Sequence, residues 1–149
     1  MSQPANNSNQ GFSLLEALIA TAIMGIGFVG VYTLAATAEL SLRNSVTRQK
    51  LQMQADQILE VIESDLTNID QYNMSLKACV APDGTETYKV RRYEWCQRLT
   101  GEVGAAATND TRSVAITTLA DGRKVVSIVL ESNNGGIQIV MKRVYYQPA

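Results

Sequence analysis

The chain has 149 residues, of which 46% are hydrophobic and 18% are charged, and its formal net charge is −1. This length accommodates one modest domain, and a net charge near zero gives no general attraction to nucleic acid or anionic lipid. The sequence contains no histidine, which removes the commonest general base, the commonest zinc ligand and the usual Ser–His and Cys–His nucleophile pairs. We therefore expect a protein that is not an enzyme and that binds no metal or other cofactor.

The N-terminal region changes character abruptly after a short polar start. Residues 1–11, MSQPANNSNQG, are polar and uncharged, and no apolar periodicity runs through them. Residues 12–38 read FSLLEALIATAIMGIGFVGVYTLAATA and contain one charged side chain, Glu16. About 20 apolar residues in a helix span the hydrocarbon core of a bilayer. The sequence therefore predicts a transmembrane helix over residues 12–38.

Three interpretations of this apolar segment are open. It could be a plain signal anchor, or a cleavable secretory signal with Ala36-Thr37-Ala38 as its cleavage site. The run is longer than the usual ~7–15 apolar residues of such a signal, and no basic segment precedes it. The third interpretation is a helix that pairs with a partner through Glu16. A carboxylate costs on the order of 3 kcal/mol near the bilayer centre, so its presence in this segment predicts such a partner. A carboxylate that snorkels to the interface is the plainer alternative.

The residues around Glu16 carry a family resemblance. Residues 11–20, GFSLLEALIA, place Phe12 directly after Gly11 and a glutamate four residues later, at the start of a long apolar helix. This pattern resembles the prepilin motif of the type IV pilin-like family, and the resemblance extends over about residues 11–62. Within the family, this start followed by the Ile-Gly-x-x-Gly stretch of Ile26, Gly27 and Gly30 is most similar to PilV-type minor pilins, with GspI-type secretion pseudopilins next.

The resemblance implies a processing and assembly chemistry. Prepilin peptidase would cut between Gly11 and Phe12, removing residues 1–11 as a leader, and would N-methylate Phe12. Glu16 of one subunit would then neutralise the N-terminal amine of a neighbour, and two buried charges that are each costly alone become tolerable when paired. The implied partners are the peptidase, the inner-membrane assembly platform and other major and minor pilins. The implied location is the inner membrane, with a periplasmic head, and later a pilus or pseudopilus.

Three glycines within the apolar run, Gly25, Gly27 and Gly30, allow two interpretations. Each glycine costs a helix about 1 kcal/mol relative to alanine, so together they could loosen it locally. They could equally form a surface on which neighbouring helices pack closely. The sequence leaves both open.

Residues 39–68 continue the helix in amphipathic form. Apolar residues recur at alternating steps of three and four: Leu51, Ala55, Ile58, Ile62, Leu66 and Ile69. This is the helical period, and we expect one helix from Phe12 to about Thr67. The stripe is expected to face a globular core, with a partner-binding zipper as the alternative.

Residues 69–149 are predicted to form a globular head. The turn signal Ala81-Pro82-Asp83-Gly84 lies between Cys79 and Cys96. Two thiols without histidine cannot make an ordinary structural zinc site, so a disulfide is the natural use of these cysteines, and it implies an oxidising compartment. Such a disulfide bond contributes on the order of 3 kcal/mol to the stability of the folded protein.

The C-terminal part of the head has the pattern of an antiparallel sheet. A polar loop is expected over Thr100–Thr111, followed by strands over residues 113–119, 124–131 and 137–146. Asp121-Gly122 predicts a type I′ hairpin, and residues 132–136 a longer turn. The predicted fold class is α+β: a long N-terminal helix packed on a C-terminal antiparallel meander, as in the head that the pilin resemblance implies.

Two further groups of residues suggest ligands. A basic–aromatic cluster could hold DNA by stacking and phosphate contacts, or could form the solvated face of a strand edge. Its members are Tyr88, Lys89, Arg91, Arg92, Tyr93, Trp95 and Arg98. Asp83, Asp110 and Asp121 could ligate calcium, but none lies in a spaced acidic run, and turn chemistry explains each.

These observations predict a structural protein. The expected function is that of a minor type IV pilin of the PilV type, which helps to initiate or tip pilus assembly for adhesion, motility or DNA uptake. A pseudopilin of a type II secretion system is the alternative within the family. The alternative of another class is a membrane-anchored periplasmic binding domain that never polymerises. Nucleic acid is not an expected partner, and the Lys89–Arg98 cluster is the one place where such contact could occur.

Overall fold

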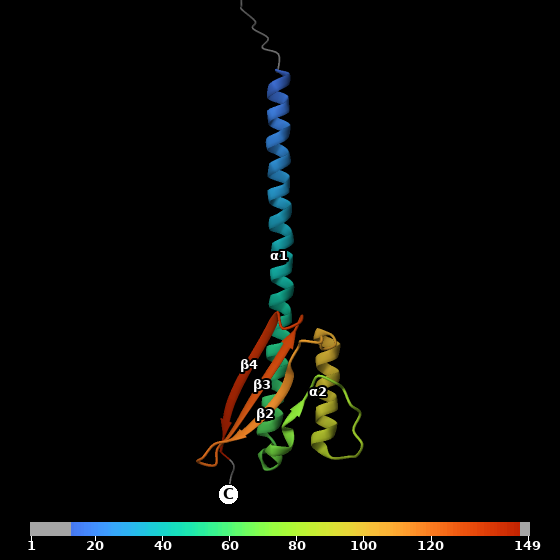
Figure 1. Cartoon of the computed structure of the whole chain (residues 1–149), viewed down its shortest axis with the longest axis vertical. Helices are drawn as coiled ribbons and strands as arrows, with labels where there is room; N and C mark the ends of the chain where they lie inside the picture. The colour runs from blue at the N-terminus through green and yellow to red at the C-terminus, as the bar shows by residue number, and fades with distance from the viewer. Residues whose placement is uncertain (1–12, 147–149) are drawn as a thin grey trace, which may run out of the picture. The chain divides into compact units, whose positions relative to one another are not determined.

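The structure is a computed structural model, and it describes residues 13–146 (Figure 1). Its elements in chain order are α1 (Leu14–Glu63), the 3-10 helix η1 (Leu66–Tyr72), β1 (Met74–Ser75), α2 (Thr87–Val103), β2 (Arg112–Thr118), β3 (Lys124–Ser132) and β4 (Ile137–Tyr145). The predicted α+β class, a long apolar N-terminal helix followed by an antiparallel sheet, is confirmed. The chain divides into two compact units, residues 1–41 and residues 42–149. We call the second unit the head.

The first unit consists, over its described residues, of the N-terminal part of α1. Every residue from 13 to 41 is exposed, and large apolar side chains remain uncovered on all sides, with Leu14 80%, Ile26 75% and Phe28 69% exposed. In the described part of the chain, α1 is the one helix long and apolar enough to cross a membrane. A helix that is apolar all round must be covered by lipid or by other helices.

Threonines in this unit are already satisfied within the helix. The hydroxyls of Thr21, Thr33 and Thr37 donate to backbone carbonyls three residues earlier, at 2.9, 2.9 and 3.0 Å respectively. Such bonds lower the cost of placing a hydroxyl in hydrocarbon, where no water accepts its proton. The hydroxyls of these three threonines are therefore compatible with an apolar surrounding.

The head's part of α1 supplies one wall of the core. Leu51, Ala55, Ile58 and Ile62 are completely buried, so the predicted core-facing stripe is confirmed. The helix ends at Glu63, slightly before the predicted end near Thr67, and η1 follows. The reason lies in Asp65, which leaves the helical conformation.

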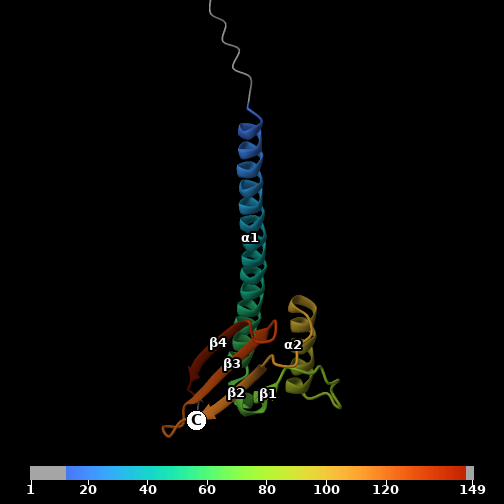
Figure 2. The same ribbon diagram turned by 45° about the horizontal axis from the view of Figure 1, so that its top comes forward.

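The sheet has the order β1-β2-β3-β4, and all its neighbours are antiparallel. The meander of β2, β3 and β4 matches the prediction, and the two-residue β1 is an addition that sequence reasoning missed. Val126, Ile128 and Leu130 on β3 are all fully buried, as strand alternation requires. Figures 1 and 2 show the sheet and α2 alongside the lower part of α1.

The first hairpin does not have the predicted type I′ turn. Gly122 has a positive φ of 83°, but Asp121 has none, and type I′ requires both. The N–H of Leu119 donates to the carbonyl of Arg123 at 2.8 Å, and that of Gly122 to Leu119 at 3.0 Å. This is the three-residue loop in which a glycine in the left-handed region completes the turn. The Asp121 carboxylate accepts the Arg123 N–H at 3.1 Å, which favours this loop.

The type I′ turn instead lies in the second hairpin. The sequence predicted only a longer turn there. Asn134 and Gly135 have φ values of 56° and 80°. The N–H of Gly136 donates to the carbonyl of Asn133 at 3.1 Å. Positive φ at both central residues is what a type I′ turn demands, and Asn-Gly is the pair that adopts it most readily.

The strand-edge interpretation of residues 88–98 is wrong. The basic–aromatic cluster lies on α2 and not on a strand edge, and the loop expected from Thr100 begins only after Val103. Tertiary packing explains the helix, because Trp95 and Leu99 are buried one turn apart, and Val103 packs on the core another turn later. Gly104, with φ of 86°, ends the helix, and its N–H donates to Thr100 at 3.0 Å.

Candidate functional site

The predicted processing site lies outside the described residues. Gly11 and Phe12, at which cleavage and N-methylation are expected, precede the first described residue, and both roles stay predictions. The structure begins immediately beyond them, at the first turn of α1.

Glu16 lies in that first turn. The N–H groups of Glu16 and Ala17 donate to the carbonyl of Ser13 at 2.9 and 3.2 Å, which closes the turn. Glu16 is exposed on the surface of the helix, beside the apolar side chains of Leu15, Ile19 and Ile23. A single carboxylate among apolar side chains is suited to pair with a cation that arrives together with an apolar surface.

The head is tied together by two polar networks, of which the first is buried. Asp110 accepts the N–H groups of Ala107 and Gly135 at 2.8 and 2.9 Å. Arg112, 2% exposed, donates to the carbonyls of Glu131 and Gly104 at 3.1 and 2.9 Å. Its Nη2 lies 4.0 Å from a carboxylate oxygen of Asp110. Asp110 and Arg112 together join the C-terminal end of α2 to the β2–β3 and β3–β4 hairpins.

The electrostatics of Asp110 follow from this geometry. Burial raises the pKa of Asp110, but the backbone donors of Ala107 and Gly135 and the charge of Arg112 outweigh burial, so the pKa is below its usual value. Arg112 was not singled out from the sequence, because an arginine at the start of a strand is ordinarily expected to be exposed.

The second network joins η1 to α2. The Tyr72 hydroxyl donates to Asp65 at 2.7 Å, and Arg91 contacts both groups, at 3.3 Å from the Asp65 carboxylate. The hydrogen bond from Tyr72 is the largest cause that lowers the pKa of Asp65. Arg91 therefore has a structural role, because its guanidinium is held by Asp65 and Tyr72.

The remaining aspartates that could have held calcium are used locally. Asp83 pairs with Lys89 at 2.8 Å, and Asp121 pairs with Arg123 at 2.6 Å. Within residues 13–146, no group of three or more histidine, cysteine, aspartate or glutamate side chains could hold a metal ion. Ion pairs and backbone hydrogen bonds within the head account for all three aspartates.

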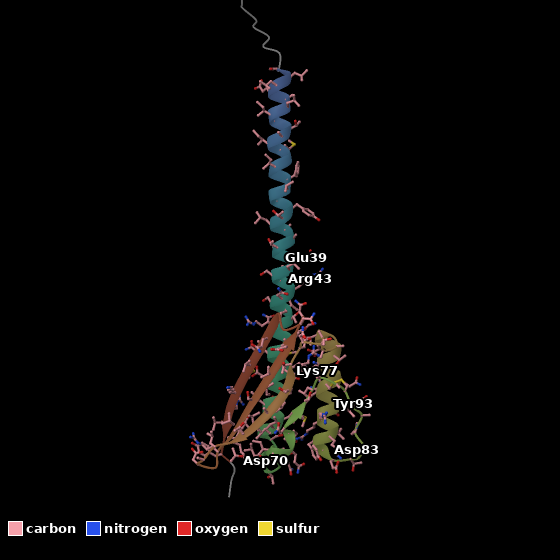
Figure 3. The ribbon with its side chains drawn as sticks, in the orientation of Figure 1. Glu39, Arg43, Asp70, Lys77, Asp83 and Tyr93 are labelled. Carbon is pink, nitrogen blue, oxygen red and sulfur yellow. A yellow bond between two sulfur atoms is a disulfide. The ribbon has the colours of Figure 1, made fainter. Side chains whose placement is uncertain are left out.

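Cys79 and Cys96 form a disulfide bond, with their Cα atoms 5.2 Å apart. The bond closes a loop of 17 residues in sequence separation and attaches the segment after β1 to the third turn of α2. Figure 3 labels Asp83 in this loop and Tyr93 on the helix.

Loss of the disulfide is expected to destabilise the head by about 3 kcal/mol. The double variant Cys79→Ser/Cys96→Ser should unfold at lower urea concentration than the oxidised protein, because its unfolded chain regains loop freedom. The fluorescence of Trp95, the only tryptophan in the chain, reports the transition. Reduced wild-type protein should match the double variant, and an unchanged midpoint in both would show that the bond contributes nothing.

Comparison with known protein families adds the decisive observation. Residues 6–32 match the model of the prokaryotic N-terminal methylation motif. The matched range contains Gly11, Phe12 and Glu16 and extends into the apolar part of α1. No curated protein and no solved structure matches the chain.

The motif, the apolar helix and the α+β head together indicate a type IV pilin-like or pseudopilin protein. A motif of this kind implies processing by prepilin peptidase and assembly with other pilins. The apolar helix fits anchoring in the inner membrane and incorporation into a pilus.

Proposed function

We propose that the chain is a minor type IV pilin of the PilV type, which helps to initiate or tip pilus assembly in adhesion, motility or DNA uptake. The observation that carries the proposal is the methylation motif at the start of a helix whose described apolar side chains are all exposed up to Ser41. The GFSLLEALIA start and the glycines at 27 and 30 favour the PilV type. A pseudopilin of a type II secretion system is the second candidate, because it would carry the same motif and helix.

In this proposal the chain has four functional segments. Residues 1–11 are the leader, residues 12–38 form the membrane and filament-core helix, residues 39–68 continue it, and residues 69–149 form the periplasmic globular part, which is the portion of the head that follows the long helix. The disulfide supports the periplasmic location, because disulfides persist in oxidising compartments and are rare in the cytosol.

Assembly would exchange lipid for neighbouring helices around the first unit. Lipid tails are as apolar as leucine, so close packing and polar pairs must drive this exchange. Gly25, Gly27 and Gly30 suit close packing, since a Cβ at any of them would meet no atom within 4 Å in the subunit itself. The amine of Phe12 and the carboxylate of a neighbour's Glu16 would supply the polar pair.

Nucleic-acid contact through the Lys89–Arg98 cluster is not part of this proposal. Lys89 is held by Asp83 and Glu86, Arg91 by Asp65 and Tyr72, and Arg98 donates to Gln57 at 3.1 Å. Most of the cluster's cations therefore already have partners in the head.

The processing step is tested by intact mass and N-terminal sequencing of the protein purified from its native membrane. The expected mature chain begins at Phe12 and carries one added methyl group. A chain that retains Met1 to Gly11 would identify a permanent anchor, the candidate of another class. A chain that begins at Glu39 would identify a discarded secretory signal and refute the pilin proposal.

A further inference from the structure

A cavity of about 350 Å³ lies in the head, between the end of η1, the disulfide-closed loop and α2. Its lining residues are Gln71, Asn73 and Met74, then Val80, Ala81, Pro82 and Asp83, and finally Tyr88, Lys89 and Arg92. This volume is at the lower end of the range of about 300–1,000 Å³ typical of ligand sites. The cavity shares no residue with the apolar helix to which the proposed function assigns assembly.

The walls of the cavity are held in place by the chain itself. The Cys79–Cys96 disulfide attaches the loop immediately before Val80 and the helix one turn beyond Arg92. At the other end of the loop, Lys89 Nζ lies 2.8 Å from Asp83 and 2.6 Å from Glu86. A loop fixed at both ends forms the cavity without a ligand, which lowers the entropy cost of binding.

Arg92 is the unusual residue of this cavity. It occupies the core-facing stripe of α2, at helical spacing between Tyr88, Trp95 and Leu99, where an apolar side chain would be expected. Its Nε is buried and has no hydrogen-bond partner. No residue in the range 13–146 accepts a hydrogen bond or forms an ion pair with Arg92, whereas Lys89, Arg91 and Arg98 all have partners. A buried donor left without an acceptor costs free energy, and because this nitrogen is itself covered, a ligand in the cavity would reach Arg92 through the terminal nitrogens of its guanidinium.

We propose that this cavity binds a carboxylate carried by a peptide, either an acidic side chain or a chain end of a protein partner, with Arg92 as the anion-binding residue. A guanidinium presents a planar fork that matches a carboxylate in a bidentate contact. Lys89 is paired with Asp83 and Glu86, whereas Arg92 forms no ion pair within residues 13–146, so Arg92 offers the one positive charge of the lining that is not already in an ion pair. One such charge complements a singly charged carboxylate better than a phosphate group, which carries about −1.5 to −2.

The rest of the lining favours a peptide as the bearer of the carboxylate. The side-chain amides of Gln71 and Asn73 can pair with the N–H and C=O groups of a peptide backbone. Met74, Pro82 and Tyr88 provide apolar surface for a neighbouring side chain. The inference goes beyond the proposed function and does not rest on it, because the head can bind such a peptide whether or not the subunit polymerises.

The test is a titration of the full-length, oxidised chain in detergent with acetyl-Leu-Glu-amide. Nuclear magnetic resonance of isotope-labelled arginine side chains follows the Nε–H signal of Arg92. The expected result is a saturable shift of that signal, absent with acetyl-Leu-Gln-amide. Arg92→Gln should weaken binding about 10- to 100-fold, as expected for the loss of a charge-assisted hydrogen bond.

Control variants separate binding from folding. Arg98→Gln removes a cation from the same helix outside the cavity and should bind the peptide like the wild type. Asn73→Asp changes an exposed residue at the cavity wall, leaves the core intact, and should weaken binding through charge repulsion. Wild-type affinity in both Arg92→Gln and Asn73→Asp would overturn the proposal.

Small anions test whether the peptide is needed. Sodium acetate and inorganic phosphate should shift the Arg92 signal only at concentrations well above those of the glutamate peptide. Equal or stronger binding of either free anion would overturn the peptide assignment. Absence of any shift with all three probes would overturn the site itself, independently of whether the chain is processed as a prepilin.

Discussion

Replacement of Glu16 by alanine is expected to leave the chain in the membrane and to exclude it from the filament. In the proposed assembly step, the amine of Phe12 enters a helical core and is neutralised by a neighbour's Glu16. Removal of one partner of a buried ion pair costs about 3–5 kcal/mol, because the other charge stays buried without compensation. This corresponds to a loss of incorporation on the order of 100-fold or more. The measurement is the amount of the chain in sheared filaments relative to the membrane fraction.

Two matched variants locate the cause of that loss. Glu16→Gln keeps the size of the side chain but removes its charge, and it should fail to assemble as Glu16→Ala does. Thr21→Ala removes a polar group that is bonded within the helix, to the carbonyls of Ala17 and Leu18, and should assemble normally. Wild-type incorporation of Glu16→Ala would instead identify a plain membrane anchor, for which loss of the carboxylate is neutral or slightly stabilising.

Replacement of Asp110 by asparagine is expected to destabilise the head by about 3–5 kcal/mol, because it leaves the buried charge of Arg112 uncompensated. The amide also places a donor group where the carboxylate accepted two backbone N–H groups, from Ala107 and Gly135. Urea unfolding of the full chain in detergent, followed by Trp95 fluorescence, measures the loss. Asp121→Asn, which weakens an exposed pair with Arg123, is the matched control and should leave the transition unchanged.

The Asp110→Asn substitution should also change how the free energy of unfolding of the head depends on pH, in a direction that the pKa of Asp110 fixes. The pKa of Asp110 is lower in the folded protein than its usual value near 3.9. Its contribution to stability is therefore complete above about pH 4 and is lost as the pH falls through the lower, folded pKa. The difference in unfolding free energy between wild type and Asp110→Asn should be constant at neutral pH and should narrow in acid. A difference that widens in acid would contradict this account.

The two networks of the head explain why its charged residues are poor guides to ligands. Arg91 and Arg112 both have cationic side chains that ordinarily face solvent, yet each bridges elements distant in sequence. Arg92 differs because its Nε is buried without a hydrogen-bond partner and its side chain forms no ion pair within residues 13–146. It is this contrast between neighbouring arginines that marks the cavity, and no pattern of residue types shows it.

The sequence alone predicted the long apolar helix and its match to the methylation motif, whereas the roles of Gly11, Phe12 and Glu16 stay predictions. An apolar run long enough for a bilayer, the carboxylate of Glu16 and the preceding Gly-Phe pair are local features, and local features need no knowledge of folding. The stripe of Leu51, Ala55 and Ile58 was also readable, because helical periodicity repeats over several turns. In the sheet, Val126 and Ile128 revealed their buried face by simple alternation. Each of these signals depends on neighbours within a few residues.

Only the tertiary structure decided the rest of the head. The aromatic and β-branched residues between Tyr88 and Trp95 suit a strand as well as a helix, and packing of Trp95 and Leu99 on the core selects the helix. The Asp110–Arg112 pair and the partnerless Arg92 depend on contacts between segments far apart in the chain. Burial converts an ordinary charged side chain into a fold-determining or binding group, and burial follows from where distant elements pack together.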